Sequence, residues 1–416
     1  MPKLTKYQRR ITWSTGIGFI LERMDAMFMS LALASIIITL HISKAQGGLL
    51  PAITAIGSIF GGIGFGALAD RYGRVKTLCW TIIIYAIGTA GMGLTNSFWM
   101  LCLFRIIIGV GNSGEYGIAI TMLSEAFSKK YLGRLSAAAG VCGQVGSIVA
   151  SLLSAFILPR FGWHVLFFIG IIPVVLAWFI RFHLPESKEF TENRDAIEKD
   201  PNRDFSHWTE LFATPAECFL TIRIMIMFMI HIAGYNGLIS WLPSIAQERM
   251  NISVAGSSLW MIATIIGMSL GIMCFGIVQD HLGSRLAYGI WLLAAAASVF
   301  LLIIAQNKLE FLIGGGIVGF CSDGMYSGYG TIVSKLYPTE IRATANNTIM
   351  SIAKSVGSFS TVLIGFLMDH FSLMAVILFL SGIYLVSFVI MLSIKELKHE
   401  NKAPVTTTEN AEKVAQ

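Results

Sequence analysis

Hydrophobic residues occur along this chain in long runs, and short polar segments separate these runs from end to end. An α-helix needs about 20 consecutive apolar residues to cross the hydrocarbon core of a bilayer, and the runs have this length. Backbone groups in lipid must find their hydrogen-bond partners within the chain, so such runs form helices. The pattern predicts twelve membrane helices, at residues 12–40, 48–69, 75–94, 98–127, 135–158, 162–183, 217–246, 253–278, 285–305, 309–336, 343–369 and 373–395.

One long polar segment interrupts this pattern between the sixth and seventh predicted helices, and it mixes acidic with basic side chains. It divides the helices into two sets of six. We therefore predict an N-terminal six-helix bundle over residues 1–183, a cytoplasmic linker over 184–215, a C-terminal six-helix bundle over 216–396 and a disordered cytoplasmic tail over 397–416.

The two sets of helices resemble each other at a constant spacing of 210 residues. Such internal repeats are typical of secondary transporters. Glycines four residues apart let membrane helices approach closely, so most of these positions are expected to serve packing. The residues that recur 210 positions later with the same identity are Gly57, Gly61, Gly66, Asp70, Gly73, Gly109, Gly114 and Tyr116.

Composition supports a membrane protein: 55% of the residues are hydrophobic and 13% are charged. Soluble domains contain about 45–50% apolar and about 25% charged residues. Lysine and arginine concentrate in the segments that would be cytoplasmic if the N-terminus is cytoplasmic, which predicts that both termini lie inside. The net charge of +6 then follows from topology and requires no nucleic-acid partner. The opposite loops hold few basic residues, namely Lys44, Arg160, Arg249 and Lys308.

The sequence contains no recognisable motif for binding a metal or ATP. The six cysteines are scattered, and no pair has the spacing of metal ligands. The chain also has no G-x-x-x-x-G-K-[ST] loop for binding ATP phosphates. We therefore expect neither a cofactor nor a metal, and a transport cycle independent of ATP.

Several ionisable residues fall inside the predicted membrane helices. A charge near the centre of a bilayer costs about 2.5–3.5 kcal/mol on insertion scales, so such residues are candidates for function. A histidine in a span is a further candidate because it titrates near neutral pH. The candidates are Glu22, Arg23, Asp25, Arg105, Glu115, Asp323, Lys354 and His231.

The stretch ILERMDAM, residues 20–27, concentrates three of these charges. Glu22 and Asp25 are three residues apart and share one face of the helix. Two neighbouring acids in a dry site favour the protonated form of at least one, so the pair could load and release a proton. Arg23 would balance the acids or hold an anionic substrate. The alternative is a static ion cluster with the fourth helix.

For the other intramembrane candidates, the sequence does not distinguish a functional role from a structural one. Glu115 lies nearer the middle of the membrane and could pair with Arg23 or with a substrate. Asp323 and Lys354 could pair with each other, or Lys354 could be a second contact for an anion. Four residues of the seventh helix could line the cavity, although a lone histidine is more often a hydrogen-bonded structural residue. These are His231, Tyr235, Asn236 and Trp241.

The loop after the second helix carries the most specific motif, GFGALADRYGRVKTL at residues 64–78. It resembles the G-x-L-A-D-R-x-G-R-K signature of the major facilitator superfamily. A weaker copy, GIVQDHLGSR at residues 276–285, lies where that family repeats the motif. The resemblance implies the major facilitator fold: an all-α membrane protein with twelve transmembrane helices in two pseudo-symmetric six-helix bundles, both termini cytoplasmic.

In that family, this loop holds the cytoplasmic side closed in the outward-open state. The resemblance implies that Asp70 meets a helix N-terminus in the other half, where the helix dipole favours an anion. It also implies that Arg74 meets Glu125. The alternative is that these charges only set topology. The full set of implied gating residues is Asp70, Arg71, Gly73, Arg74, Glu125, Asp280 and Arg285.

Four shorter fragments indicate a branch of the family: RIIIGVGNSGEYG at 105–117, LPES at 184–187, GYNGLISWLP at 234–243 and YPTEIRAT at 337–344. They resemble proton-coupled sialate, niacin, aromatic-acid and other metabolite symporters, in which the arginine matching Arg105 takes part in proton coupling. Gly143 is followed by Gln144, so the Gly-Pro pair of drug–proton antiporters is missing.

These observations predict a secondary active transporter of the cell membrane that takes up a small organic acid or sugar acid with protons by alternating access. We expect a monomer, with Glu22, Asp25, Arg105 and Glu115 in proton coupling. The alternatives are a proton-driven exporter, a facilitator of a neutral sugar or other metabolite, and a membrane sensor. An enzyme is disfavoured because no catalytic constellation has a recognisable spacing.

Overall fold

The computed structural model describes residues 5–127, 129–182, 211–212, 214–337 and 342–398; for some residues inside these ranges it describes the backbone only. Every regular element in these ranges is helical. The first bundle contains α1 (Lys6–Leu40), α2 (Lys44–Tyr72), α3 (Arg74–Leu94), α4 (Phe98–Ala126) and α5 (Lys129–Phe182). The second contains α7 (Pro215–Met250), α8 (Val254–Leu282), α9 (Ser284–Ser298), α10 (Leu301–Ile304), α11 (Lys308–Asp323), η2 (Gly324–Gly328), α12 (Tyr329–Leu336), α13 (Arg342–Gly357), α14 (Ser360–His370), α15 (Leu373–Ser393) and η3 (Lys395–Lys398).

These elements contain the twelve predicted membrane helices. The fifth and sixth together form α5, which turns at Gly162, where φ is +75°. The tenth is interrupted by η2, and the eleventh is divided between α13 and α14. In the part of the chain that the structure describes, eight helices are long and apolar enough to cross a membrane.

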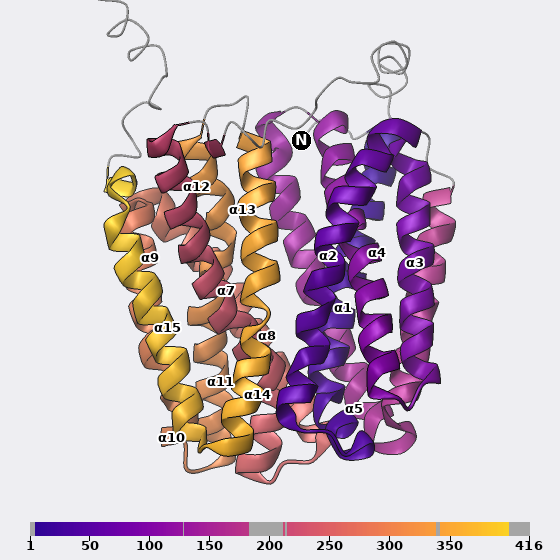
Figure 1. Ribbon diagram of the computed structural model, residues 1–416, viewed down its shortest axis with the longest axis vertical. Coiled ribbons are helices and arrows are strands. Elements are labelled where there is room, and N and C mark those ends of the chain that lie inside the picture. The colour runs from indigo at the N-terminus through magenta and orange to yellow at the C-terminus, as the bar shows by residue number, and fades with distance from the viewer. Residues whose placement is uncertain (1–4, 128, 183–210, 213, 338–341, 399–416) are drawn as a thin grey trace, which may run out of the picture.

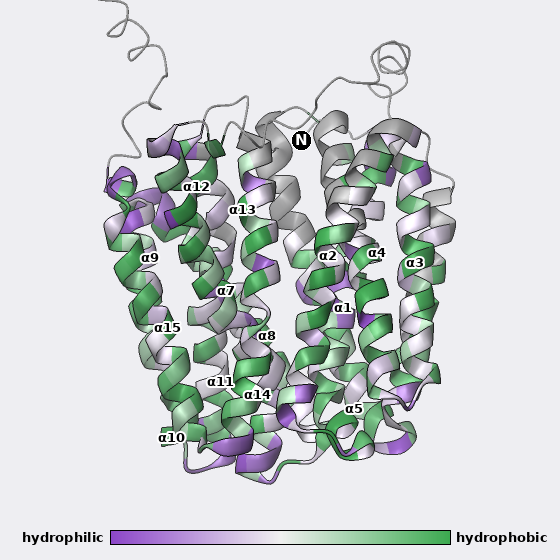
Figure 2. Cartoon of the chain, viewed as in Figure 1, coloured by the Kyte–Doolittle hydropathy of each residue, from purple (hydrophilic) through white to green (hydrophobic). Residues whose placement is uncertain are grey.

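The helices form two bundles side by side, with α1 to α5 in one and α7 to α15 in the other (Figure 1). Hydrophobic residues cover the middle of the helices, and strongly hydrophilic residues gather near their ends (Figure 2). Large apolar side chains such as Trp99, Leu94 and Ile38 are more than 70% exposed, which in a membrane places them against lipid. The end of the bundles opposite the N-terminus is called the distal end below.

Helix ends follow local sequence signals. Thr5 and Ser43 each form a capping box, in which the side chain accepts a hydrogen bond from the backbone N–H of a glutamine three residues later. Gly73 and Gly283 each separate two helices, with φ of 107° and 82°. Only glycine adopts such values readily, so the 210-residue repeat includes the same sharp turn in both bundles.

The repeat also extends to contacts between helices. Several glycines have no room for a side chain, because a Cβ atom there would overlap a backbone carbonyl of the neighbouring helix. Every one of three such contacts in the first bundle recurs in the second with both partners shifted by 210 residues. The contacts are Gly57 with Ile106, Gly61 with Val110 and Gly109 with Thr54, followed by Gly267 with Gly316, Gly271 with Phe320 and Gly319 with Thr264.

A matched pair of substitutions on α2 tests this packing. Gly61→Ala would force α2 away from the Val110 backbone of α4, and overpacking of this kind costs about 1–3 kcal/mol. Gly64→Ala, one turn away, adds its methyl group to open space. Thermal unfolding of the purified variants in detergent should show a clear decrease in Tm for Gly61→Ala and none for Gly64→Ala. Equal midpoints would contradict the close approach.

Candidate functional site

A buried ion pair joins α1 to α4. Nη1 of Arg105 lies 3.0 Å from Oδ2 of Asp25, and the two residues are 2% and 6% exposed. Within the described residues, Oδ1 of Asp25 and both Nε and Nη2 of Arg105 have no hydrogen-bond partner. Buried charges that are only partly satisfied carry a desolvation cost, and removing one partner of such a pair typically costs about 3–5 kcal/mol. The pair is therefore well placed to respond to a proton.

A second group of polar residues lies where the two bundles meet. Arg23 of α1 donates a hydrogen bond from Nη1 to the hydroxyl of Tyr235 on α7, at 3.1 Å. The Arg23 guanidinium is 5.7 Å from the ring centroid of Tyr326, and Nζ of Lys354 is 5.5 Å from the same centroid. These distances are in the range of cation–π interactions. Two cations from different bundles therefore converge on one aromatic ring.

Asp323, the last residue of α11, completes this group. Its Oδ2 accepts a hydrogen bond from Nε2 of Gln144 on α5, at 3.2 Å, so this bond also crosses between the bundles. The residue is fully buried, and Oδ1 finds no hydrogen-bond partner among the described residues. Electrostatic interactions link Asp323 with Arg23 and with Tyr235. We call this group the central cluster; it consists of Arg23, Gln144, Tyr235, Asp323, Tyr326 and Lys354.

The central cluster can hold a carboxylate. Arg23 and Lys354 supply two positive charges, and Tyr235 and Gln144 supply hydroxyl and amide donors. The Tyr326 ring offers an apolar face beside the charges. Opposite charges interact strongly in a region of low dielectric, and these groups come from both bundles.

Asp323 accepts a hydrogen bond from Gln144, and Nζ of Lys354 lies over the Tyr326 ring, which favours the alternative in which Lys354 is a second contact for an anion. The expected sharing of one site by Glu22 and Asp25 differs from the structure: Asp25 turns to Arg105. Glu22 is half-buried and interacts electrostatically with Arg23.

Two residues of α7 have packing contacts instead of the predicted contact with substrate. The ring nitrogens of His231 are both bonded, one to the hydroxyl of Tyr329 and one, at 2.8 Å, to the carbonyl of Ser322. The indole N–H of Trp241 donates to the carbonyl of Thr361 at 2.9 Å, and the side chain is fully buried.

Asn236, also on α7, is only half-buried, and its Nδ2 donates to the hydroxyl of Ser358 at 3.2 Å. Ser358 lies between α13 and α14, where the eleventh predicted span is interrupted. Asn236 therefore stays a candidate for the cavity wall.

The structure describes the side chains of only some of the expected gating residues. The side chains of Glu115, Asp70, Arg71, Arg74 and Glu125 lie outside the residues whose side chains the structure describes.

The second copy of the gating motif is placed more fully. Asp280 is exposed. Arg285 donates to the carbonyl oxygens of Leu392 and Ile394, at 2.9 and 3.3 Å, at the end of α15. Helix C-termini favour cations, so Arg285 anchors α9 to α15 inside one bundle rather than crossing to the other.

At the distal end the two bundles are held together by a contact that sequence reasoning missed. The carboxylate of Asp369, near the end of α14, accepts hydrogen bonds from the backbone N–H groups of Lys44 and Ala45, at 3.0 and 2.9 Å. These are the first residues of α2, so an aspartate of one bundle caps a helix of the other. Nζ of Lys44 also forms an ion pair with Glu248 of α7, at 2.8 Å.

Two substitutions separate these distal contacts. Asp369→Ala removes two charge-assisted bonds at a helix N-terminus and should destabilise the closed distal end by about 1–2 kcal/mol. Glu248→Ala removes an exposed ion pair worth about 0–1 kcal/mol.

Spin labels at Ser97→Cys and Gln306→Cys, with the six natural cysteines replaced, would measure the distance across the distal end. The ratio of the longer-distance to the shorter-distance population should grow about 5- to 30-fold with Asp369→Ala and change little with Glu248→Ala. The opposite ranking would contradict the cap.

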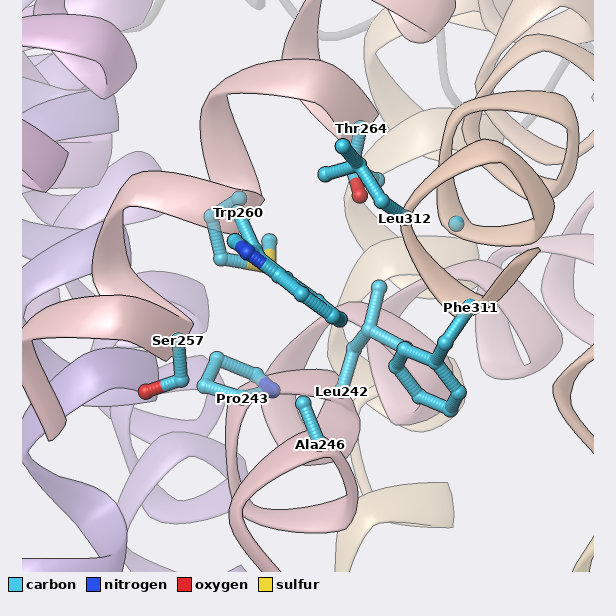
Figure 3. Close-up of a pocket in the computed structure, with 10 residues that line it drawn as sticks. Leu242, Pro243, Ala246, Ser257, Trp260, Thr264, Phe311 and Leu312 are labelled. Carbon is cyan, nitrogen blue, oxygen red and sulfur yellow. The ribbon is translucent and has the colours of Figure 1, made fainter. Parts of the chain in front are cut away.

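A pocket lies away from the central cluster, within the second bundle (Figure 3). Trp260 and Phe311 stack across it, with ring centroids 6.0 Å apart. Its wall contains no charged side chain, so it lacks the groups that would recognise an anion. The lining residues come from α7, α8 and α11 and are Leu242, Pro243, Ala246, Ser257, Trp260, Met261, Thr264, Phe311, Leu312 and Gly315.

Sequence reasoning did not single out Gln144 or Tyr326 for the site, although signals for both exist. Tyr326 is the repeat of Tyr116 at the spacing of 210 residues. Gln144 is a polar residue on the glycine-rich face of the predicted fifth helix, where nothing in the local sequence identifies its partner.

Comparison with known proteins places the chain in a family. The model of the Major Facilitator Superfamily matches residues 15–272 and 224–415. A Haemophilus influenzae protein named for metabolite transport is 32% identical over 92% of this chain and 95% of its own length. The sialic acid transporter of Escherichia coli is 30% identical over 88% of this chain and 89% of that protein. The cis,cis-muconate transport protein of Acinetobacter baylyi is 29% identical over 94% and 96%.

Solved structures with the same fold include the xylose transporter of Escherichia coli in a partially occluded, inward-open conformation, with a TM-score of 0.76 and 16% identity over 94% of this chain and 98% of that one. A bacterial homologue of the human lysosomal transporter Spinster, inward-facing and occupied, gives a TM-score of 0.77 at 17% identity over 95% and 98%. At these identities the likeness concerns the fold alone. Fold and sequence together show that this chain is a multi-pass membrane transporter, not an enzyme, and that it belongs to the major facilitator superfamily.

Proposed function

We propose that this protein imports a small organic anion together with protons across the cell membrane by alternating access between its two bundles. The observation that carries this proposal is the convergence of Arg23 and Lys354, from different bundles, on the ring of Tyr326. A carboxylate between the two cations would favour a state in which the bundles close around it. Because one chain supplies both bundles, a monomer is sufficient.

The names of several relatives support an anionic substrate. They include transporters of sialic acid, cis,cis-muconate and 4-hydroxybenzoate. Each of these compounds carries a carboxylate, and none of the three names is that of a neutral sugar. For this chain, the charge of the central cluster favours the same chemical class, a carboxylate of the size of a small metabolite.

We assign proton coupling to Asp25 and Arg105. Protonation of Asp25 would neutralise one member of the buried pair and leave Arg105 without its counter-ion. A buried cation without a partner is costly, so the proton would change the relative stability of the two orientations of the bundles. Glu22 and Glu115 stay further candidates on the same path.

The orientation of the chain gives the distal contacts a role. With the N-terminus cytoplasmic, as the distribution of basic residues predicts, the distal end faces outward. The cap formed by Asp369 on α2 then closes the external side, and the central cluster would communicate with the cytoplasm. Opening this cap would be the first step in admitting a substrate from outside.

Uptake into proteoliposomes tests the proposal. Purified protein would first be screened by thermal shift against sialic acid, cis,cis-muconate, nicotinate, 4-hydroxybenzoate, shikimate and hexuronates. A compound that stabilises the protein should then accumulate when the proton concentration is higher outside, and an uncoupler should abolish the accumulation. Equal accumulation with and without a proton gradient would contradict proton coupling. Stabilisation by neutral sugars alone would contradict a carboxylate substrate.

A further inference from the structure

We propose that Asp323 is an internal anion that competes with the substrate for Arg23, so that a carboxylate substrate binds tightly only when Asp323 is protonated. This inference rests on the proposed function and adds a second proton-dependent site in the other bundle. It makes proton binding and substrate binding one event at the central cluster, in addition to the effect of a proton at Asp25.

The geometry of Asp323 supports a group that can accept a proton without rearrangement. Gln144 donates to Oδ2, whereas Oδ1 has no hydrogen-bond partner in the described part of the chain. A proton on Oδ1 would leave the bond to Gln144 in place. Tyr235 favours the ionised carboxylate as a hydrogen-bond donor, and rotation of its hydroxyl hydrogen alone would let it accept a hydrogen bond from the protonated form.

Charge balance explains the competition. Arg23 is half-buried, and it interacts electrostatically with Asp323 and with Tyr235. While Asp323 is ionised, the positive charge of Arg23 is already compensated. A substrate carboxylate would then bring a second negative charge into a region of low dielectric, where like charges repel strongly. Protonation of Asp323 removes the internal anion and leaves Arg23 available for the substrate.

The other ionisable groups around Asp323 do not change charge between pH 5.5 and 8 under the geometry observed. Tyr235, Tyr326, Tyr329 and Tyr384 come from four elements, and tyrosines ionise only near pH 10. His231 has both ring nitrogens bonded: Ser322 offers only an acceptor, so Nε2 donates and Nδ1 accepts from Tyr329. Two acids interact electrostatically with Arg23, namely Asp323 and Glu22. Glu22→Gln is therefore the variant that separates an effect of Glu22 from that of Asp323.

The test measures the affinity for sialic acid and for cis,cis-muconate, whose carboxylates stay ionised from pH 5.5 to 8. In the wild-type protein, the dissociation constant should increase with pH, by at most about tenfold per unit, because one proton is linked to binding. In Asp323→Asn the affinity should equal that of the wild type at low pH and stay constant. Isothermal titration calorimetry at several pH values gives these constants.

Matched variants distinguish the possible failures. Asp280→Asn, on the exposed face of α8, should keep the wild-type pH profile. Should Asp323→Asn fail to fold, Asp323→Ser is the second variant, since Ser113 occupies the position 210 residues earlier. If the dissociation constants of the Asp323 variants still increased with pH as in the wild type, this inference alone would be overturned. Failure of the wild type to bind either carboxylate would overturn both the proposed function and the inference.

Discussion

Asp25→Asn is expected to decrease strongly the accumulation of substrate driven by a proton gradient while exchange of labelled for unlabelled substrate continues. Asparagine keeps the size of the side chain and an oxygen that can accept from Arg105, but it cannot take up or release a proton. Proteoliposomes with an inward proton gradient should therefore accumulate substrate to a level well below that of the wild type, because only the proposed proton at Asp323 remains coupled. In the wild type, accumulation should exceed this level and collapse with an uncoupler.

Exchange under equal proton concentrations is the control for this variant, because it requires binding and movement of the bundles but no net proton transfer. Replacing Asp25 leaves the buried cation of Arg105 less well compensated, so a moderate decrease in thermal stability is expected as well. Accumulation by Asp25→Asn at the wild-type level would show that the coupling proton binds elsewhere. Loss of both accumulation and exchange would assign Asp25 a structural role.

Arg23→Ala is expected to weaken the binding of a carboxylate substrate by about 10- to 150-fold, which corresponds to about 1.5–3 kcal/mol for a hydrogen bond to a charged group. The guanidinium can bind a carboxylate with two parallel hydrogen bonds. Its loss also leaves Asp323 without the nearby cation. Calorimetry at low pH, where the proposed competition from Asp323 is absent, gives the cleanest comparison.

Arg23→Lys separates charge from geometry. Lysine keeps the positive charge but not the planar fork of donors, so intermediate affinity is expected. Unchanged affinity in Arg23→Ala would move the substrate away from the central cluster. Affinity equal to the wild type in Arg23→Lys, with a large loss in Arg23→Ala, would show that only the charge is needed.

The number and placement of the helices could be predicted from the sequence, because the length of each apolar run reports directly on the thickness of the bilayer. The interruptions inside helices could not. The short turn at Gly324–Gly328 and the break between α13 and α14 lie inside predicted spans, in segments rich in glycine and serine. Glycines there are also what close helix packing requires, so the local sequence does not distinguish a break from a contact.

Most residues of the central cluster could be predicted from the sequence for a different reason. An ionisable side chain in lipid is costly, which makes Arg23, Asp323 and Lys354 conspicuous. The contacts among these residues could not be predicted from the sequence, because they depend on how helices far apart in sequence are placed. Lys354 follows Asp323 by one helix, which allows a pair between them, whereas the observed hydrogen bond joins Asp323 to Gln144 in the other bundle.

The contact made by Asp369 could not be predicted, because a charged residue at the end of a membrane helix is usually solvated. Its partners are backbone N–H groups, which every residue but proline carries, so no side chain in the sequence identifies the contact. Contacts of this kind can be recognised only once the ends of two distant helices are known to meet.

The repeated glycine contacts have a consequence for assembly in the cell. The six repeated contacts join α2 to α4 in the first bundle and α8 to α11 in the second, and none of them involves a residue of the other bundle. We therefore expect a gene cut between the codons for residues 183 and 216 to yield two polypeptides that insert separately and reunite as a working transporter. Co-purification of the two fragments, each carrying a different affinity tag, would reveal that reunion.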